Sequence, residues 1–177
     1  PKPLAQLWSV TPFKFVSQTG DTISNALLKD HVYVADFIFT NCEGTCPNLS
    51  RHFMEIQNAY KEDTRVKLLS FSVDPDRDSI AALKEYSKRY NATEGKWFFM
   101  TGAKKDLADL FMNGFKVPVD MDHLDAKGQI THSEKVMLVD GDGMVRKYYD
   151  GTVDNNIDSL INNIEYLLVE KHKEPGQ

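Results

Sequence analysis

The chain has 177 residues and a net charge of −5, and its apolar and charged fractions, 41% and 27%, are those of an ordinary globular domain. It contains no basic stripe or arginine cluster, which argues against nucleic acid as a partner, and no apolar run of the roughly 20 residues that a membrane-spanning helix needs. We expect a single domain over residues 1–177, with a linker-like start over 1–10 and a frayed tail over 171–177.

The first part of the chain alternates predicted strands with predicted helices. In order, the expected elements are a hairpin formed by residues 13–16 and 22–23, a helical turn over 25–28, a buried strand over 31–39, a helix over 47–60 and a second buried strand over 66–73. A strand, a helix and a second strand in this order form a right-handed crossover that joins two parallel strands.

The second part continues the alternation and ends in a hairpin and a helix. The expected elements are a helix capped by Asp78 or Ser79, a brief strand over 97–100, a helix over 104–111, a long loop over 117–130, paired strands over 135–139 and 145–149, and an amphipathic helix with apolar positions from 157 to 168. Together these elements predict an α/β domain.

The only two cysteines, Cys42 and Cys46, lie in one short loop between the first buried strand and the helix after it. Pro47 suits the first helical position, where its missing N–H is no loss, and Gly44 allows a tight turn between the thiols. A helix N-terminus stabilises a thiolate through its dipole and its N–H groups. A structural disulfide is the alternative, but a bridge across so short a loop removes little chain entropy, so a functional pair is favoured.

Three motifs resemble those of the Sco/SenC family of thioredoxin-fold copper proteins. They are the Cys-x-x-x-Cys-Pro loop at 42–47, the acidic segment at 72–78, and Thr131-His132 ahead of the strand at 135–139. The resemblance covers residues 13–168 and implies a thioredoxin-like fold, with a central mixed sheet flanked by helices and an N-terminal β-hairpin. The sequence departs from the family pattern at Glu43-Gly44, where Pro-Asp is usual, and at Thr131, where Asp is usual. Both changes bear on metal affinity and redox potential.

The resemblance implies that Cys42, Cys46 and His132 hold one copper ion. In a thioredoxin-like fold the loop before the third core strand passes close to the cysteine loop, which turns His132 toward the sulfurs; a histidine hydrogen-bonded at a strand end is the alternative. Two thiolates favour copper(I), and the imidazole nitrogen also lets copper(II) bind. Zinc in a closed structural site takes a fourth protein ligand, for which the sequence has no clear candidate.

Two acidic residues and one further histidine are accessory candidates. From the residues alone, Asp74 and Asp78 indicate a solvated turn and a helix cap, whereas the resemblance implies a role in metal transfer or partner docking. His123 lies beside Met121 and Asp122 in the predicted long loop and is a candidate for transient metal capture. The histidines for which no metal role is expected are His31, His52 and His172.

The resemblance implies a metallochaperone rather than an enzyme, one that delivers copper to, or prepares, the binuclear copper centre of cytochrome c oxidase. Its partners are then the copper-bearing subunit of that oxidase and another copper carrier. The alternative is a thiol–disulfide oxidoreductase that reduces partner cysteines through Cys42 and Cys46 and does not need His132. The resemblance also implies an extracytoplasmic domain, in the periplasm or the mitochondrial intermembrane space, and a membrane anchor removed ahead of Pro1-Lys2-Pro3.

Overall fold

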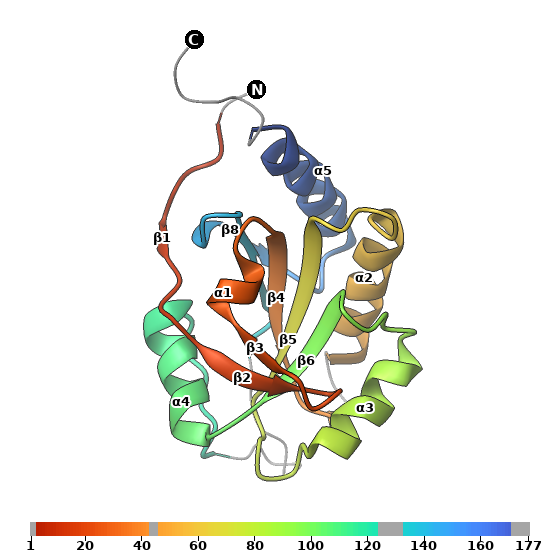
Figure 1. Cartoon of the computed structure of the whole chain (residues 1–177), viewed down its shortest axis with the longest axis vertical. Coiled ribbons are helices and arrows are strands. Elements are labelled where there is room, and N and C mark those ends of the chain that lie inside the picture. Colours follow the sequence, from red (N-terminus) through yellow and green to blue (C-terminus); the bar gives the residue numbers. More distant parts are fainter. Residues whose placement is uncertain (1–2, 43–45, 124–132, 171–177) are drawn as a thin grey trace.

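The computed structural model describes residues 3–42, 46–123 and 133–170, and within them one sheet of eight strands in the order β1-β8-β7-β4-β5-β6-β2-β3 (Figure 1). The strands are β1 (Trp8–Ser9), β2 (Lys14–Ser17), β3 (Thr22–Ser24), β4 (Val32–Ile38), β5 (Val66–Ser72), β6 (Trp97–Thr101), β7 (Lys135–Val139) and β8 (Met144–Asp150). The helices are α1 (Asn25–Leu28), α2 (Cys46–Ala59), α3 (Ile80–Arg89), α4 (Lys104–Asp109), the π-helical turn η1 (Leu110–Gly114) and α5 (Asp154–Glu170). None of the described helices is both long enough and apolar enough to cross a membrane.

The centre of the sheet consists of three parallel strands, and its flanks are antiparallel. β4 pairs with β5 and β5 with β6 in parallel, whereas β7 lies antiparallel on the other side of β4. The helices α2 and α3 connect the parallel strands, as the predicted crossovers require. This arrangement confirms the predicted mixed sheet flanked by helices, and the pair β2 and β3 confirms the N-terminal hairpin.

Helices cover both faces of the sheet, which explains why its central strands are buried along nearly their whole length. α2, α3 and α5 lie on one side, and α4 lies on the other (Figure 1). Phe37 of β4 packs against Phe111 of η1 with ring centroids 4.7 Å apart, while Phe53 of α2 packs against Trp97 of β6 at 5.8 Å. All seven residues of β4 are buried, as is typical of a parallel strand covered on both faces.

The carboxyl ends of β4 and β5 lie side by side, and this edge of the sheet positions the candidate site. Ile38, the last residue of β4, pairs with Ser72, the last residue of β5. The chain leaves β4 toward Cys42 and leaves β5 toward Asp74, so two segments that are far apart in the sequence meet at this edge.

The predicted cap of α3 was Asp78 or Ser79, and the structure selects Ser79, whose side chain accepts a hydrogen bond from Ala82 N at 3.1 Å. Two local features differ from the predicted elements. The helix expected over 104–111 is interrupted at Leu110, where the π-helical turn η1 begins. The two-residue strand β1, which pairs with β8, was not predicted at all.

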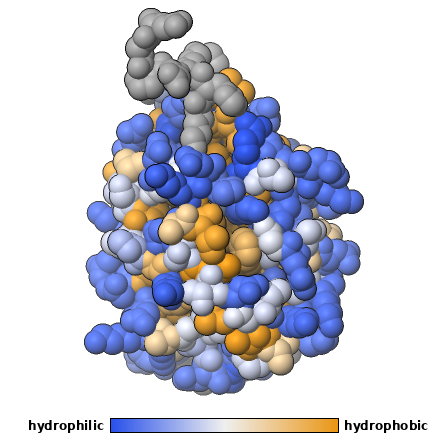
Figure 2. Space-filling model, in the orientation of Figure 1, coloured by the Kyte–Doolittle hydropathy of each residue, from blue (hydrophilic) through white to orange (hydrophobic). Residues whose placement is uncertain are grey.

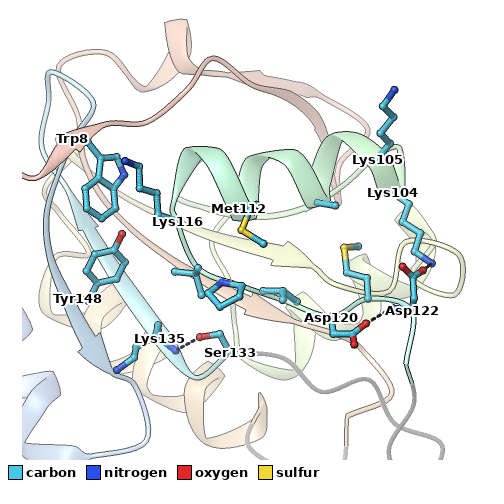
Figure 3. A pocket seen from close by; sticks show the side chains of 15 residues that line it. Trp8, Lys104, Lys105, Met112, Lys116, Asp120, Asp122, Ser133, Lys135 and Tyr148 are labelled. Atoms are coloured by element: carbon cyan, nitrogen blue, oxygen red, sulfur yellow. Dashed lines mark hydrogen bonds and ion pairs between the residues drawn. The ribbon is translucent and has the colours of Figure 1, made fainter.

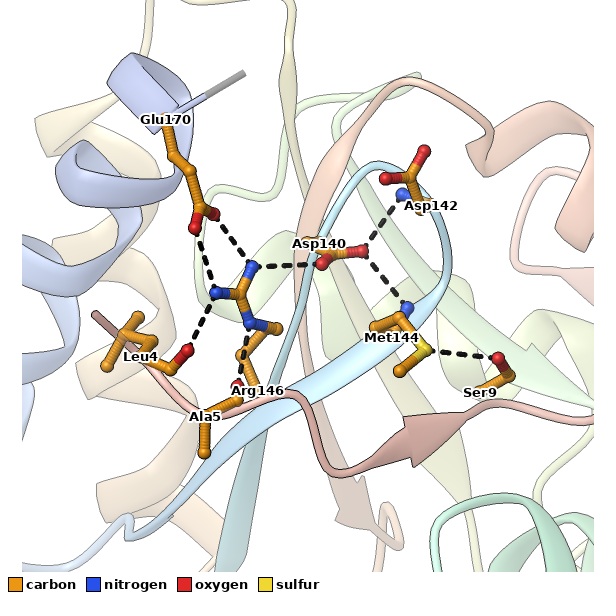
Figure 4. Close-up of polar contacts among 8 residues, drawn as sticks. All are labelled: Leu4, Ala5, Ser9, Asp140, Asp142, Met144, Arg146 and Glu170. Atoms are coloured by element: carbon orange, nitrogen blue, oxygen red, sulfur yellow. Dashed lines mark hydrogen bonds and ion pairs between the residues drawn. The ribbon is translucent and has the colours of Figure 1, made fainter. Parts of the chain in front are cut away.

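Arg146 joins three distant segments near the amino ends of the central strands (Figure 4). Its side chain is 2% exposed and forms ion pairs with Asp140 at 3.0 Å and Glu170 at 2.8 Å. It also donates hydrogen bonds to the carbonyl oxygens of Ala5 at 2.7 Å and Leu4 at 2.9 Å. The hydrogen bond to Glu170, more than the one to Asp140, raises the pKa of Arg146. The chain is therefore attached to the domain from Leu4 onward, in the part where a linker-like start was expected.

The face of the molecule seen in Figure 1 is mostly hydrophilic, and apolar side chains gather near its centre, around α1 (Figure 2). Leu27 of α1 is 57% exposed. Isolated exposed apolar residues are normal on globular proteins, so we assign Leu27 no function.

Candidate metal centre

Cys42 and Cys46 lie in contact between β4 and α2. The N–H of Cys42 donates to the carbonyl oxygen of Phe39 at 3.2 Å, which turns the chain after β4. Cys46 is the first residue of α2 and is fully buried, whereas Cys42 is half-buried. Both side chains are thiols in this structure, and they are hydrogen-bonded to each other. The two sulfurs are therefore close together, as the chelation of one ion requires.

Burial determines the acidity of Cys46. It raises the pKa of the thiol far above its usual value, and the hydrogen bond and charge of Cys42 raise it further. A backbone hydrogen bond from Phe39 opposes the shift, and the charge of Asp36 adds to it. Cys46 is thus a neutral thiol at pH 7, because burial outweighs the helix dipole that the sequence led us to consider. A metal ion that binds here has to displace this proton.

Asp36 is a buried acid near the cysteines that we did not predict. It lies in β4, is 0% exposed and pairs in register with Ser70 of β5. Its neighbour Phe37 packs against η1, so the alternation of side chains along a strand directs Asp36 to the face that α2 covers. The sequence signal was one acid inside the apolar run over 31–39, and buried acids of this kind occur mostly at functional sites.

Asp78 connects the ends of the two central strands. Its Oδ1 accepts hydrogen bonds from Thr40 N at 3.1 Å and Thr40 Oγ1 at 2.6 Å, and its Oδ2 accepts one from Ser72 Oγ at 2.6 Å. Burial raises the pKa of Asp78, although these hydrogen bonds oppose the shift. The expectation of a helix cap was wrong, because Ser79 caps the helix while Asp78, 1% exposed, points back to the strand ends. Asp78 thereby holds Thr40, two residues before Cys42.

Asp74 is also buried rather than part of a solvated turn. It is 5% exposed and forms an ion pair with Arg77 Nε at 2.6 Å, and its N–H donates to Ser72 Oγ at 3.1 Å. The loop over 73–77 lines a pocket of about 230 Å³ together with Lys104 at the start of α4 and with Met121 and Asp122. The acidic loop and these two segments therefore share one rim of the molecule.

The predicted ligand His132 lies outside the residues that the structure describes. β7 runs antiparallel to β4 with Ala35 opposite Met137, so β7 begins toward the carboxyl end of β4. The described chain after His132 thus starts on the side of the sheet edge where the cysteine loop lies, and the role of His132 stays a prediction. Also outside the described residues are Glu43, Gly44, Thr131 and His172.

Comparison with known proteins identifies the family. The family model described as SCO1/SenC matches residues 4–168. The chain belongs to the SCO1/SenC family. A SCO1 protein homolog of Bacillus subtilis is 34% identical over 160 residues, which make up 89% of this chain and 82% of that protein.

Two solved structures of SCO1/SenC proteins have the same fold. A SCO1/SenC family lipoprotein from Bacillus anthracis superposes with a TM-score of 0.83 at 31% identity, covering 91% of this chain and 95% of that one. BsSco, a member of the Sco family of cytochrome c oxidase assembly proteins in which a disulfide switch was identified, superposes with a TM-score of 0.82 at 33% identity. That comparison covers 96% of this chain and 98% of BsSco.

His52 and His123 of this SCO1/SenC chain have side-chain partners that decide how each is assigned. His52 is buried and bonds through Nδ1 to the carbonyl oxygen of Gly151 at 2.5 Å and through Nε2 to Asp154 at 2.9 Å, so it joins α2 to the start of α5. His123 is exposed and bonds through Nδ1 to Asp120 at 2.6 Å. His52 is therefore structural, and His123 stays a candidate for transient metal capture.

Among the described residues, no group of three or more histidine, cysteine, aspartate or glutamate side chains is arranged to hold a metal ion. Cys42 and Cys46 are two of the three ligands predicted for this SCO1/SenC chain, and their ligation of a metal stays a prediction. Two thiols in contact fit a soft ion, since thiolate ligands select copper(I) over the harder divalent metals.

Proposed function

We propose that this protein is a copper chaperone that delivers copper to, or prepares, the binuclear copper centre of cytochrome c oxidase. The observation that carries the proposal is the contact between the thiols of Cys42 and Cys46 at the start of α2 in a SCO1/SenC chain. Copper is the cargo of such a protein. The similarity to BsSco, from a family of oxidase assembly proteins, supports the oxidase as the destination.

The proposed copper ligands are Cys42, Cys46 and His132. Both cysteines lose their protons when the ion binds, so copper binding releases protons and is weaker at low pH. The two thiolates hold copper(I), and the imidazole adds the nitrogen donor on which copper(II) depends.

The unequal burial of the two thiols gives copper exchange an order. Cys42 is half-buried and is the sulfur that a ligand of the partner reaches first, whereas the buried Cys46 releases the ion last. Asp78 holds Cys42 in position for this exchange, because Asp78 accepts hydrogen bonds from Thr40 and so fixes the chain that leads to Cys42.

A thiol–disulfide oxidoreductase is the second candidate function, favoured by the same contact between thiols and by the disulfide switch of BsSco. The thiolate of Cys42 attacks a partner disulfide and releases one partner thiolate, which takes up a proton. Cys46 then attacks the sulfur of Cys42 and releases the second partner thiol. The partner gains two electrons, and Cys42 and Cys46 are left as a disulfide.

We place the protein outside the cytoplasm on a membrane anchor, in the periplasm or an equivalent compartment. The similarity to a Bacillus anthracis lipoprotein of the same family supports this location. The proposed partners are the copper-bearing subunit of the oxidase and another copper carrier that loads the site.

Replacing His132 by Ala separates the two functions. In a copper site the variant loses its nitrogen donor, so we expect copper(II) affinity to fall by more than about 100-fold and copper(I) affinity to fall less, since two thiolates remain. Oxidation of Cys42 and Cys46 to a disulfide is expected to persist. Competition titrations with copper(I) and copper(II), together with thiol counting after mild oxidation, measure these effects.

His31→Ala is the matched control, because His31 bonds to the carbonyl oxygen of Lys29 in another part of the molecule. It is expected to bind both copper ions like the wild type. Unchanged copper(II) affinity in His132→Ala would remove His132 from the site and leave the oxidoreductase as the better proposal.

A further inference from the structure

A second surface feature is a large groove on the face of the sheet that α4 and η1 cover (Figure 3). Its volume is about 1370 Å³, and its lining is mainly apolar or aromatic, from Trp8, Met112, Val117, Val119, Met121 and Tyr148. Grooves lined in this way are typical of binding sites. None of the described residues in the lining is a proposed copper ligand.

One end of the groove is formed by two aromatic rings that the backbone holds in place. Trp8 Nε1 donates to the carbonyl oxygen of Gly114 at 3.1 Å. The hydroxyl of Tyr148 donates to the carbonyl oxygen of Phe115. The two ring centroids are 5.7 Å apart. Aromatic side chains fixed in this way lose little freedom when a partner packs on them, which makes them effective anchors at interfaces.

The backbone beside these rings has an unusual conformation. η1 is a π-helical turn, a rare form that is frequent at functional sites, and Lys116, just after it, has a φ of 55°. A non-glycine residue with positive φ stores strain that is also concentrated at functional sites. Here the conformation places the ammonium of Lys116 4.7 Å from the ring centroid of Trp8, at the rim of the groove.

The groove carries positive charge although the whole chain is acidic. Lys104, Lys105, Lys116 and Lys135 line it, against only two acids among the described lining residues, Asp120 and Asp122. Asp122 and Lys104 form an ion pair at 2.6 Å, which leaves Lys105, Lys116 and Lys135 against Asp120. An apolar floor with a basic rim complements an acidic protein segment that also has an apolar side chain, and such complementarity steers association.

We propose that this groove docks an acidic segment of the copper-bearing oxidase subunit, with one apolar side chain of that segment packed between Met112 and Trp8. The inference rests on the proposed function for the identity of the partner. Lys104, Met121 and Asp122 line both the groove and the pocket of the acidic loop. A partner seated in the groove is therefore held beside the rim where Asp74 lies.

Tryptophan fluorescence reports on this docking directly. The chain has two tryptophans, of which Trp97 is 0% exposed, so a partner that enters the groove changes the emission of Trp8. The probe is the soluble copper domain of the oxidase subunit from the same organism, titrated into the wild-type protein. We expect a saturable change whose midpoint shifts to higher concentration as salt screens the lysines.

Variants of the groove test its chemistry. Lys116→Gln with Lys135→Gln removes two charges, and Met112→Ser removes the apolar contact of a residue that is 54% exposed. Each change is expected to weaken docking by about five- to tenfold while copper binding stays like that of the wild type. The matched controls are Lys14→Gln with Lys84→Gln, two exposed lysines elsewhere, and Leu27→Ser; these are expected to dock normally.

Three outcomes would overturn the groove as the docking site: no binding by the wild-type protein, binding that the groove variants leave unchanged, or equal weakening by the controls. Self-association of the wild type that the same variants abolish, seen by sedimentation, would make a second copy of this chain the occupant instead. Docking that depends on the groove in a protein that fails to bind copper would support the groove and overturn the proposed function.

Discussion

Asp78 shows how a single buried side chain supports the cysteine loop. It accepts two hydrogen bonds from Thr40 and one from Ser72 while being only 1% exposed. Asp78→Ala leaves these donors without their acceptor, so we expect the free energy of unfolding to fall by about 1–3 kcal/mol. Copper affinity is expected to fall by at most about 100-fold, because Asp78 acts through Thr40 and is not a ligand. Urea unfolding and copper competition measure the two effects.

The same loop contains a matched control for this prediction. Asp76 is exposed, and Asp76→Ala is expected to change stability by less than about 0.5 kcal/mol. An Asp78→Ala protein that keeps its stability but loses copper completely would identify Asp78 as a ligand.

For single residues, the sequence indicated the cysteines and, through the resemblance, Asp74 and Asp78, but it did not indicate the contacts of Asp78 or the role of Asp36. Cys42 and Cys46 stand out because they are the only thiols and lie in one loop. The position of Asp78 depends on which strand ends lie side by side, and Ser79 next to it is an equally good cap in the sequence. Asp36 is a single acid in an apolar run, and the surroundings of its buried side chain depend on how α2 packs on the sheet.

Among the structural elements, the turn from β8 to α5 supports α2, the helix that begins with Cys46. A Cβ on Gly151 would lie 2.2 Å from Leu49 Cδ2 of α2 and 2.7 Å from Val136 Cγ2 of β7. Gly151→Ala therefore pushes α2 away from the sheet, and we expect it to lower the free energy of unfolding by about 1–3 kcal/mol. The displacement is also expected to change the reaction rate of the thiols with a disulfide reagent.

Gly102→Ala separates general overpacking from this local effect. Its Cβ would lie 2.6 Å from Phe15 Cδ1, near the hairpin of β2 and β3 and away from α2. It is expected to lower stability but to leave the thiol rate unchanged. Equal changes of the thiol rate in both variants would show that the turn has no special connection to the cysteines.

Most elements could be predicted from periodicity and turn residues, and the exceptions have physical reasons. β1 has only two residues, too few to show a period, and its existence depends on the free edge of β8. η1 has the same apolar spacing as an α-helix, so the change in hydrogen bonding after Asp109 leaves no trace in the sequence.

For the whole molecule, the ion pairs of Arg146 predict how stability depends on pH. The hydrogen bond from Arg146 lowers the pKa of Glu170, so the stabilisation is present above the ordinary glutamate pKa of about 4.3 and is lost as the pH falls through the lowered value. Glu170→Gln removes this contribution, so we expect its melting temperature at pH 7 to be about 2–4 °C lower. The difference from the wild type should shrink as the pH falls through the lowered pKa of Glu170, because Glu170 is then protonated in both states of the wild type.

Thermal unfolding at several pH values tests this dependence. Glu85→Gln is the control, because Glu85 is exposed and its ion pair with Lys88 spans 3.4 Å at the surface. A difference between Glu170→Gln and the wild type that stays constant from pH 7 down to full protonation of the carboxylates would contradict the assignment to an ion pair.

The family and the mixed sheet could be predicted for the whole chain, since three separate motifs and the order of elements agreed. The attachment of the N-terminal segment to the domain could not be predicted. It depends on Arg146, one basic residue in an otherwise ordinary strand, and its partners lie near both ends of the described chain. Contacts between such distant positions leave no local pattern.

The Arg146 contacts also have a mechanical consequence. Tyr33, at the amino end of β4, pairs with Val139 beside Asp140, so Arg146 holds the N-terminal segment at the end of the sheet away from Cys42. If the proposed membrane anchor joins the chain ahead of Leu4, a pulling force on it would act first on the hydrogen bonds from Arg146 to Leu4 and Ala5. Because Arg146 lies in β8 and pairs with Glu170 of α5, that load would enter these two elements and not the cysteine loop at the opposite end of β4.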